Sequence, residues 1–278
     1  MPLDGLFIDM YGTLTTGDKA AVEAVCTQLV GDTGVRRPAA HLPAINGPTL
    51  PHRAGRDHDG APLTAPELAI LWGERFFADM ESCHGDGFRT LAQLEADSLV
   101  QTLAEFGVSV DPLPYVRRLI EYWRDPPLQP EAREFLQCCA AGSPIDAVRS
   151  RAGAAPKAGN AAARCLPICI VSNADRADLE TAIARLGLPV AALVTSEEAR
   201  SYKPHPAIFE LALARTGWRR DRVVHVGDSL HSDIGGARAA GLRCAWVNRA
   251  HRIHDIGAGD PDHECTDLLD VLQKLGAD

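Results

Sequence analysis

Hydrophobic and polar positions alternate in short blocks along the second half of the chain. Apolar runs of strand length occur at 166–171, 190–194, 223–226 and 243–247, and helical patterns occur at 177–186, 206–216, 234–240 and 267–275. Another apolar run, at 3–8, opens the chain. Because alternating strands and helices form parallel sheets covered on both faces, this pattern predicts an α/β fold with a doubly wound sheet.

Residues 18–124 follow a different pattern, in which apolar positions recur at three- and four-residue spacing. Helices are predicted over 18–30, 67–80, 91–106 and 114–123, and another over 131–140. The stripe of Leu68, Leu71, Trp72 and Phe76 is typical of a buried helix face. This part of the chain is therefore predicted to be mostly helical.

Two segments lack either period. Residues 36–66 are rich in Pro, Gly and His, and they predict an irregular loop. Residues 142–164 are mainly small residues with several basic ones. Since they interrupt a helix-to-strand connection that normally takes only a few residues, they predict a flexible insertion in the core.

Composition narrows the possible partners. The 278 residues carry a net charge of −9, and phosphate contacts need clustered Lys and Arg, so general binding to nucleic acid or anionic membranes is not expected. The N-terminus lacks a secretion-signal pattern, no apolar run approaches the length of a membrane span, and the eight cysteines include no CxxC pair. We expect a cytoplasmic protein with reduced thiols.

Polar residues stand where four predicted strands or loops end. They are Asp9 in FIDMYGTL, Ser172 and Asn173 after PICIV, Lys203 in SYKPHPAIF, and Asp228 and Asp233 in HVGDSLHSD. The carboxyl ends of parallel strands meet at one edge of the sheet, where open α/β sheets bind ligands. Each residue alone is a weak signal, since a strand-end Asp often caps the next helix, but the ordered set is a strong one.

With these four motifs in this order, the chain resembles the haloacid dehalogenase superfamily, a group of phosphatases and dehalogenases with an aspartyl nucleophile. The resemblance spans nearly the whole chain. It implies a Rossmann-like core at 1–16 and 126–278, with an inserted α-helical cap at 17–125. The helical pattern described above falls within that cap.

The resemblance also implies roles for the motif residues. Asp9 would be the nucleophile, Ser172 would bind the transferring group, and Lys203 would neutralise charge. Mg²⁺ would be held by Asp9, Asp228, Asp233 and the backbone carbonyl of Tyr11. Thr13 and Asn173 are expected beside the phosphate, where Thr13 would also bond the turn backbone and Asn173 would fix its loop.

Tyr11 makes the first motif, DMYGT, ambiguous. Phosphatases of the superfamily usually have Asp at this place to protonate the leaving alcohol, whereas its haloacid dehalogenases have Tyr and need no metal. The fourth motif, GDSLHSD, instead resembles that of metal-dependent phosphatases. A tyrosine with a pKa near 10 is a poor proton donor, so the replacement acid is not identified by the sequence.

Electrostatics favour the phosphatase. Repulsion between two unit charges about 4 Å apart is about 4 kcal/mol at an effective dielectric near 20. Asp9, Asp228 and Asp233 oppose a single Lys203, so an anionic substrate needs a bound cation, and Mg²⁺ suits oxygen ligands. We therefore favour a Mg²⁺-dependent phosphatase acting on a small phosphorylated metabolite through an aspartyl-phosphate.

Two alternatives stay open. One is a metal-independent 2-haloacid dehalogenase that forms an aspartyl ester, and the other is a weakly active or non-catalytic member of the fold that binds a ligand.

Several neighbouring residues receive structural interpretations. Asp175 is expected to cap the helix that follows it, Trp72, Phe76, Phe77 and Trp123 to form the cap interior, and Arg36 or Arg37 is only a minor candidate for binding an anionic substrate group.

Overall fold

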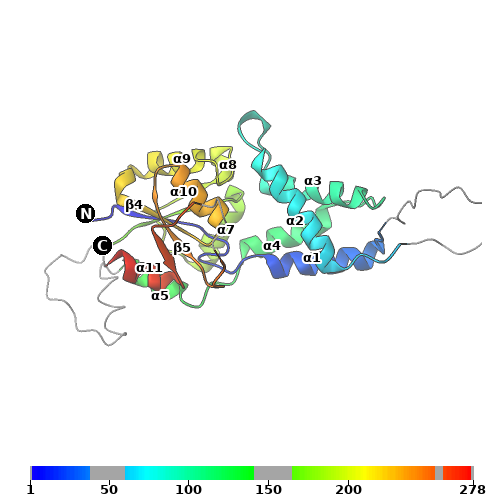
Figure 1. Cartoon of the computed structure of the whole chain (residues 1–278), viewed down its shortest axis with the longest axis horizontal. Helices are drawn as coiled ribbons and strands as arrows, with labels where there is room; N and C mark the ends of the chain where they lie inside the picture. The colour runs from blue at the N-terminus through cyan, green and yellow to red at the C-terminus, as the bar shows by residue number, and fades with distance from the viewer. Residues whose placement is uncertain (1, 38–59, 141–164, 254–258, 277–278) are drawn as a thin grey trace, which may run out of the picture.

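The computed structural model describes residues 2–37, 60–140, 165–253 and 259–276 (Figure 1). The predicted insertion at 142–164 and most of the predicted loop at 36–66 lie outside these residues. At the described ends of that loop, Arg36 forms an isolated antiparallel bridge with Pro62, and the next helix begins at Ala65.

A six-stranded sheet in the order β3-β2-β1-β4-β5-β6, with all strands parallel, forms the centre of the core. The strands are β1 (Gly5–Ile8), β2 (Ile168–Ser172), β3 (Ala192–Thr195), β4 (Val223–Gly227), β5 (Arg243–Val247) and β6 (His263–Cys265). This confirms the predicted α/β class and parallel sheet. The strand β6 was not predicted, because its three residues, HEC, carry no apolar pattern.

Helices cover both faces of this sheet, as a doubly wound fold requires. They are α5 (Ala132–Ala140), α7 (Arg176–Leu186), α8 (Ser196–Ala199), α9 (Ala207–Thr216), α10 (Gly236–Ala239) and α11 (Leu268–Leu275). Apolar residues of α5, α7 and α11 pack with one face, and those of α9 and α10 pack with the other. Figure 1 shows α9 and α10 above the sheet and α5 and α11 below it.

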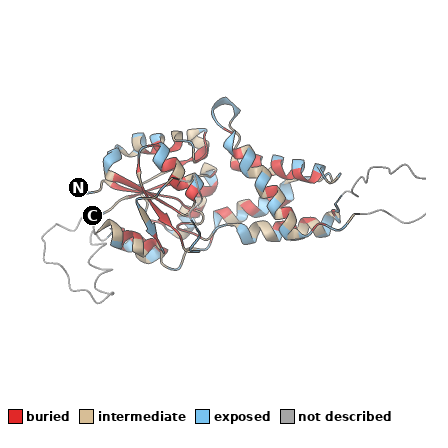
Figure 2. Cartoon of the chain, viewed as in Figure 1, coloured by how far each residue is buried: buried red, intermediate tan, exposed pale blue. Residues whose placement is uncertain are grey.

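A second group of helices follows β1 and lies to one side of the sheet (Figure 1). It consists of α1 (Lys19–Thr33), α2 (Ala65–Glu81), a 3-10 turn (Gly85–Gly87), α3 (Leu91–Ala104) and α4 (Leu113–Arg124). These helices have an apolar interior of their own, in which Leu29, Leu68, Trp72 and Leu99 are at most 1% exposed. Figure 2 shows buried and exposed residues alternating along these helices. The division into core and cap at 16/17 and 125/126 stays a prediction.

The ends of the helices follow local chemistry. The first helix was expected to stop before Gly31, but α1 continues to Thr33, and the chain leaves it at Gly34 in a left-handed conformation with φ of 59°. Glycine reaches that conformation without steric cost, so Gly34 ends the helix, whereas Gly31 is tolerated inside it. In the described part of the chain no helix has both the length and the apolar character needed to cross a membrane.

We expect Leu99→Ala to lower the free energy of unfolding by about 2–5 kcal/mol, because it removes a fully buried side chain and leaves a cavity. Val100→Ala, at the next position of α3, where the side chain is 39% exposed, should change it by less than about 0.5 kcal/mol. Urea denaturation of both variants measures the difference. Equal losses would contradict the packing described for α3.

Candidate active site

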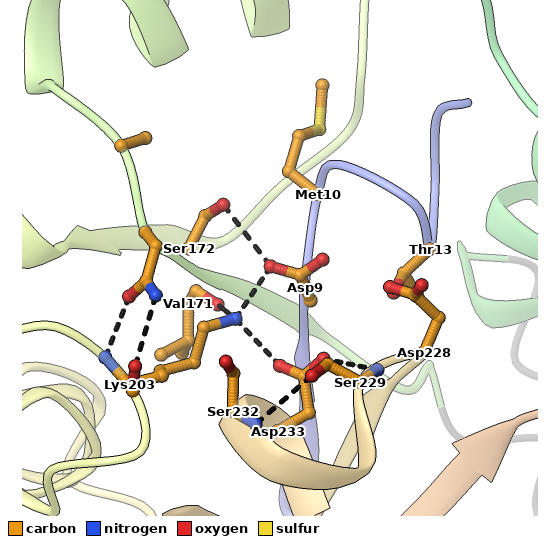
Figure 3. A network of polar contacts seen from close by, with 12 residues as sticks. Asp9, Met10, Thr13, Val171, Ser172, Lys203, Asp228, Ser229, Ser232 and Asp233 are labelled. Atoms are coloured by element: carbon orange, nitrogen blue, oxygen red, sulfur yellow. Dashed lines mark hydrogen bonds and ion pairs between the residues drawn. The ribbon is translucent and has the colours of Figure 1, made fainter. Parts of the chain in front are cut away.

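The predicted site residues meet at the carboxyl edge of the sheet. Asp9 follows β1, Ser172 ends β2, and Asp228 follows β4. The connections from β1 and β4 leave in opposite directions along the sheet, so a crevice forms between these two strands. Lys203 reaches the same place from the segment before α9, and Figure 3 shows it between Asp9 and Asp233.

Lys203 holds the centre of this cluster. Its ammonium donates to Asp9 Oδ1 at 2.6 Å, to Asp233 Oδ1 at 2.7 Å and to the carbonyl of Val171 at 3.0 Å. The three donors of the ammonium therefore each have an acceptor, although the side chain is only 2% exposed. Ser172 adds a donor at 3.3 Å to Asp9 Oδ1.

Asn173 fixes the backbone that carries this lysine. Its side-chain oxygen accepts from the Lys203 N–H at 2.8 Å, and its amide nitrogen donates to the Lys203 carbonyl at 3.2 Å. The predicted role of Asn173 in fixing a loop thus matches its contacts, and the loop is the one before α9.

Three carboxylates form the only candidate metal-binding cluster among the described residues. One oxygen each from Asp9, Asp228 and Asp233 lies within 4.8 Å of the others. Two glycines permit this approach, since a Cβ on Gly12 would stand 2.5 Å from Asp228 Oδ1 and a Cβ on Gly227 would stand 2.2 Å from Asp233 Cγ. An all-oxygen set of this kind suits a hard divalent cation.

Each carboxylate is held by a different set of donors. Thr13, fully buried, donates to Asp228 Oδ1 at 3.1 Å. Asp233 Oδ1 contacts His225 Nε2 at 2.9 Å in addition to Lys203, and the Ser229 N–H donates to Asp233 Oδ2 at 3.1 Å. Asp228 thus has the weakest compensation for its charge.

The pKa values reflect this imbalance. Burial raises the pKa of Asp228 to about 7, and the nearby Asp233 and Asp9 carboxylates act in the same direction. Burial also raises the pKa of Asp9, against the influence of Lys203. Burial alone would raise the pKa of Asp233 too, but Lys203 and His225 hold it below its ordinary value. The cluster therefore lacks positive charge.

The Tyr11 hydroxyl is bonded to the helical region and not to Asp9. It donates at 2.9 Å to the carbonyl of Trp123, near the end of α4. Burial raises the pKa of this hydroxyl above its ordinary value, and nearby carboxylates add to the effect. The Tyr11 side chain therefore links the loop after β1 to α4 and does not supply a proton at Asp9.

A cavity of about 240 Å³ opens above the cluster. Asp9, Ser172, Asn173, Lys203, Asp228 and Asp233 line its core side, and Asp18, Phe76, Phe77, Met80, Leu91, Glu95 and Trp123 line its cap side, with Tyr11 between them. Phe77 is 58% exposed, so its predicted place in the cap interior is wrong. It lies on the side of α2 that faces this cavity.

Other residues considered in the sequence lie elsewhere. Arg37 pairs with Glu67, and Arg36 donates to the Gly60 carbonyl. Neither arginine is among the residues that line the cavity. Asp175 precedes α7 but makes no side-chain capping bond to it. That prediction is wrong, because the Asp175 carboxylate instead accepts from two backbone N–H groups in the first turn of α3.

Sequence reasoning missed two residues that organise the site. His225, inside β4, contacts Asp233, and a titratable residue in an otherwise apolar strand was the available signal. Arg249 donates to the carbonyls of Gly12 and Thr13 at 2.9 Å each and pairs with Glu131. No motif marks Arg249, so the sequence offered no comparable signal for it.

The fold and the site define a hydrolase of one family. The family model described as haloacid dehalogenase-like hydrolase matches residues 3–241. The chain belongs to this family, and the predicted membership is confirmed.

Curated relatives include both of the family's chemistries. The chain is 45% identical over 113 residues to haloacid dehalogenase-like hydrolase domain-containing protein 3 of Danio rerio, which is 39% of this chain and 43% of that protein. It is 40% identical over 111 residues to the pyrimidine 5'-nucleotidase of Escherichia coli (39% and 49%). It is 30% identical over 112 residues to (S)-2-haloacid dehalogenase 2 of a Pseudomonas species (40% and 48%). Each match spans less than half the length of the relative.

Solved structures resemble the whole chain. L-2-haloacid dehalogenase from Xanthobacter autotrophicus matches with a TM-score of 0.69 and 17% identity, over 99% of this chain and 98% of that one. A HAD-hydrolase of Bacillus subtilis bound to magnesium matches with a TM-score of 0.64 and 17% identity, over 99% and 100%. At such low identity these likenesses establish the fold alone.

In metal-free protein, Asp228→Asn should raise the free energy of unfolding at pH 8, on the order of 1–4 kcal/mol, and less at pH 5. The pKa of Asp228 is about 7 in the folded protein and about 4 for an unfolded Asp. The carboxylate therefore lowers the free energy of unfolding as the pH rises from about 4 to about 7, and the full loss is present at pH 8. Urea denaturation in a chelator at both pH values measures the effect.

Asp233→Asn is the matched control. Its carboxylate is stabilised by Lys203 and His225, so its removal should destabilise the protein at both pH values. A loss of stability at pH 8 in Asp228→Asn would contradict the electrostatic description of the cluster.

Proposed function

We propose that this hydrolase is a Mg²⁺-dependent phosphatase that cleaves a small phosphoric monoester through an aspartyl-phosphate. The observation that carries the proposal is the cluster of Asp9, Asp228 and Asp233, in which a single ammonium group, that of Lys203, pairs with Asp9 and Asp233. Without another cation, a phosphate would enter against an excess of negative charge. A bound divalent cation would reduce the repulsion among these carboxylates and between them and the phosphate.

The donors fit magnesium. The proposed ligands are Asp9, Asp228, Asp233 and the Tyr11 carbonyl, all of which offer oxygen, the atom that Mg²⁺ prefers. When bound, the ion would neutralise charge on the phosphate oxygens. The magnesium-bound hydrolase of Bacillus subtilis, which has the same fold, supports this choice.

The protein's own groups have distinct proposed tasks. Lys203 and Ser172 fix Asp9 Oδ1 and so orient the carboxylate that attacks phosphorus. Attack forms an acyl-phosphate and releases the alkoxide or phenolate, and water then attacks the acyl-phosphate to release phosphate and regenerate Asp9. Ser172 and Asn173 line the cavity where the phosphate would bind. Thr13 would act on Asp228 through its hydrogen bond, and its contact with a phosphate oxygen stays a prediction.

Dehalogenation is the second candidate, favoured by Tyr11 and by the dehalogenases among the relatives and related structures. A haloacid substrate brings a carboxylate that needs a positive partner. Lys203 is the one basic residue among those that line the cavity, and Asp9 and Asp233 already occupy it. This charge distribution supports phosphate ester hydrolysis with a metal over halide displacement without one.

The direct test is phosphate release from 4-nitrophenyl phosphate with and without Mg²⁺. We expect activity that chelation abolishes, no turnover by Asp9→Asn, and a loss of roughly 10²–10³-fold in Asp228→Ala, because the ion stabilises transition-state charge by several kcal/mol. Asp221→Asn, an exposed Asp paired with Arg219, serves as the control and should match wild type.

Chloride release from 2-chloropropionate, measured in parallel, separates the two candidates. Release that persists in a chelator, with no phosphate release, would establish the dehalogenase. Tight ligand binding without turnover in either assay would support the non-catalytic alternative.

The Tyr11 hydroxyl is committed to Trp123, so no acid is expected to protonate the leaving group from that position. An efficient general acid contributes about 10²–10⁴-fold. We therefore expect kcat to fall steeply as the leaving-group pKa rises across a series of substituted phenyl and alkyl phosphates. A flat dependence on leaving-group pKa would show that another residue supplies the proton.

A further inference from the structure

Glu95 is a buried carboxylate that the proposed reaction does not use. It lies on α3, is 7% exposed and lines the cap side of the active-site cavity. Its carboxyl group has no hydrogen bond or ion pair with any of the residues described. A buried carboxyl group without a partner carries a desolvation cost, and a ligand can offset that cost.

A second cavity, of about 450 Å³, lies within the cap next to the first. The two cavities share four lining residues: Asp18, Phe76, Phe77 and Glu95. Beyond them the lining is largely apolar, with Val22, Pro66, Ala69, Ile70 and Trp72. Glu95 and Asp18 therefore stand at the junction between a polar reaction site and an apolar compartment.

The ionisable groups at this junction are acidic. Lys19 is the one basic residue that lines the cap cavity, its side chain is 89% exposed, and it pairs with Glu23 at 4.0 Å. Burial, with the nearby Asp18 carboxylate, raises the pKa of Glu95 well above its ordinary value, which indicates that no positive group compensates it. Phe76 and Phe77 add aromatic faces, which attract cations.

We propose that Glu95, assisted by Asp18, recognises a positively charged amino group in the leaving group of the substrate, with the attached hydrocarbon or aromatic part in the cap cavity. This inference rests on the proposed function, which places the phosphate at Asp9. The substrate class is then a phosphate monoester whose leaving group is a cationic amine with apolar character.

The core fixes the position of Glu95. The Asp175 carboxylate accepts from the N–H groups of Leu91 at 2.7 Å and Ala92 at 3.1 Å, which are the first residues of α3. Glu95 follows one turn later on the same helix. A residue after β2 thus sets the distance between the phosphate position and the proposed amine position.

The test compares two phosphates of matched shape and leaving-group chemistry, 4-(2-aminoethyl)phenyl phosphate and 4-propylphenyl phosphate. We expect wild type to favour the amine in kcat/KM on the order of ten- to hundredfold, as for a charged hydrogen bond. In Glu95→Gln the ratio should fall toward one, and Asp18→Asn, a second variant, should lower it too. Asp97→Asn, which removes an exposed charge from the same helix, should keep the wild-type ratio.

A wild-type ratio of one or less, or an unchanged ratio in both Glu95→Gln and Asp18→Asn, would overturn the inference while leaving the phosphatase intact. If neither compound releases phosphate, the proposed function fails, and calorimetry with 2-phenylethylamine and 2-phenylethanol tests the amine site without turnover. We expect the amine to bind more tightly, and Glu95→Gln to remove the difference. Equal binding of the two compounds to wild type would overturn the amine site.

Discussion

The buried ammonium of Lys203 is the constraint on which the site depends. A charge removed from water must be matched by close partners, and the partners here come from the loop after β1, the end of β2 and the π-helical turn Leu230–Gly235 after β4. Because all three segments bind the same ammonium group, segments far apart in the sequence lie together at this point. One cation does not balance the three carboxylates of the cluster, and this deficit of positive charge is the basis for proposing a metal ion at the site.

The core and the cap helices are joined by contacts made close to the reacting groups. Asp175 binds the first turn of α3, Arg124 at the end of α4 pairs with Asp178 of α7 at 2.6 Å, and Tyr11 binds the Trp123 carbonyl. The core residues that make these contacts follow Asp9 and Ser172 closely in the sequence: Tyr11 after Asp9, and Asp175 and Asp178 after Ser172. The walls of the cavity are therefore positioned by the same loops that carry Asp9 and Ser172.

Sequence patterns predicted the fold, and they predicted that the motif residues meet at one edge of the sheet, because strand periodicity and strand-end polar residues are local signals. The roles of these residues stay a prediction. The short polar strand β6 carried no such signal. The partner of Asp175 was mistaken because capping rules consider only the helix next in sequence, whereas the actual helix, α3, lies 84 residues away at Leu91. Glu95 was missed for a related reason. In the sequence Glu95 is one of several acidic residues in a helical pattern. Only its burial beside two cavities distinguishes it from the others.

The tie between Tyr11 and Trp123 has an evolutionary consequence. An exchange of Tyr11 for aspartate would place a carboxylate at this position, yet it would also remove the hydrogen bond that joins the loop carrying Asp9 to α4. The bonds of Tyr122 and Trp123 to residues 16–18 would remain. One substitution would thus both add the carboxylate and remove the hydrogen bond to the Trp123 carbonyl. The two forms of the motif therefore differ in more than a proton donor, because this position also holds a contact between the loop after β1 and α4.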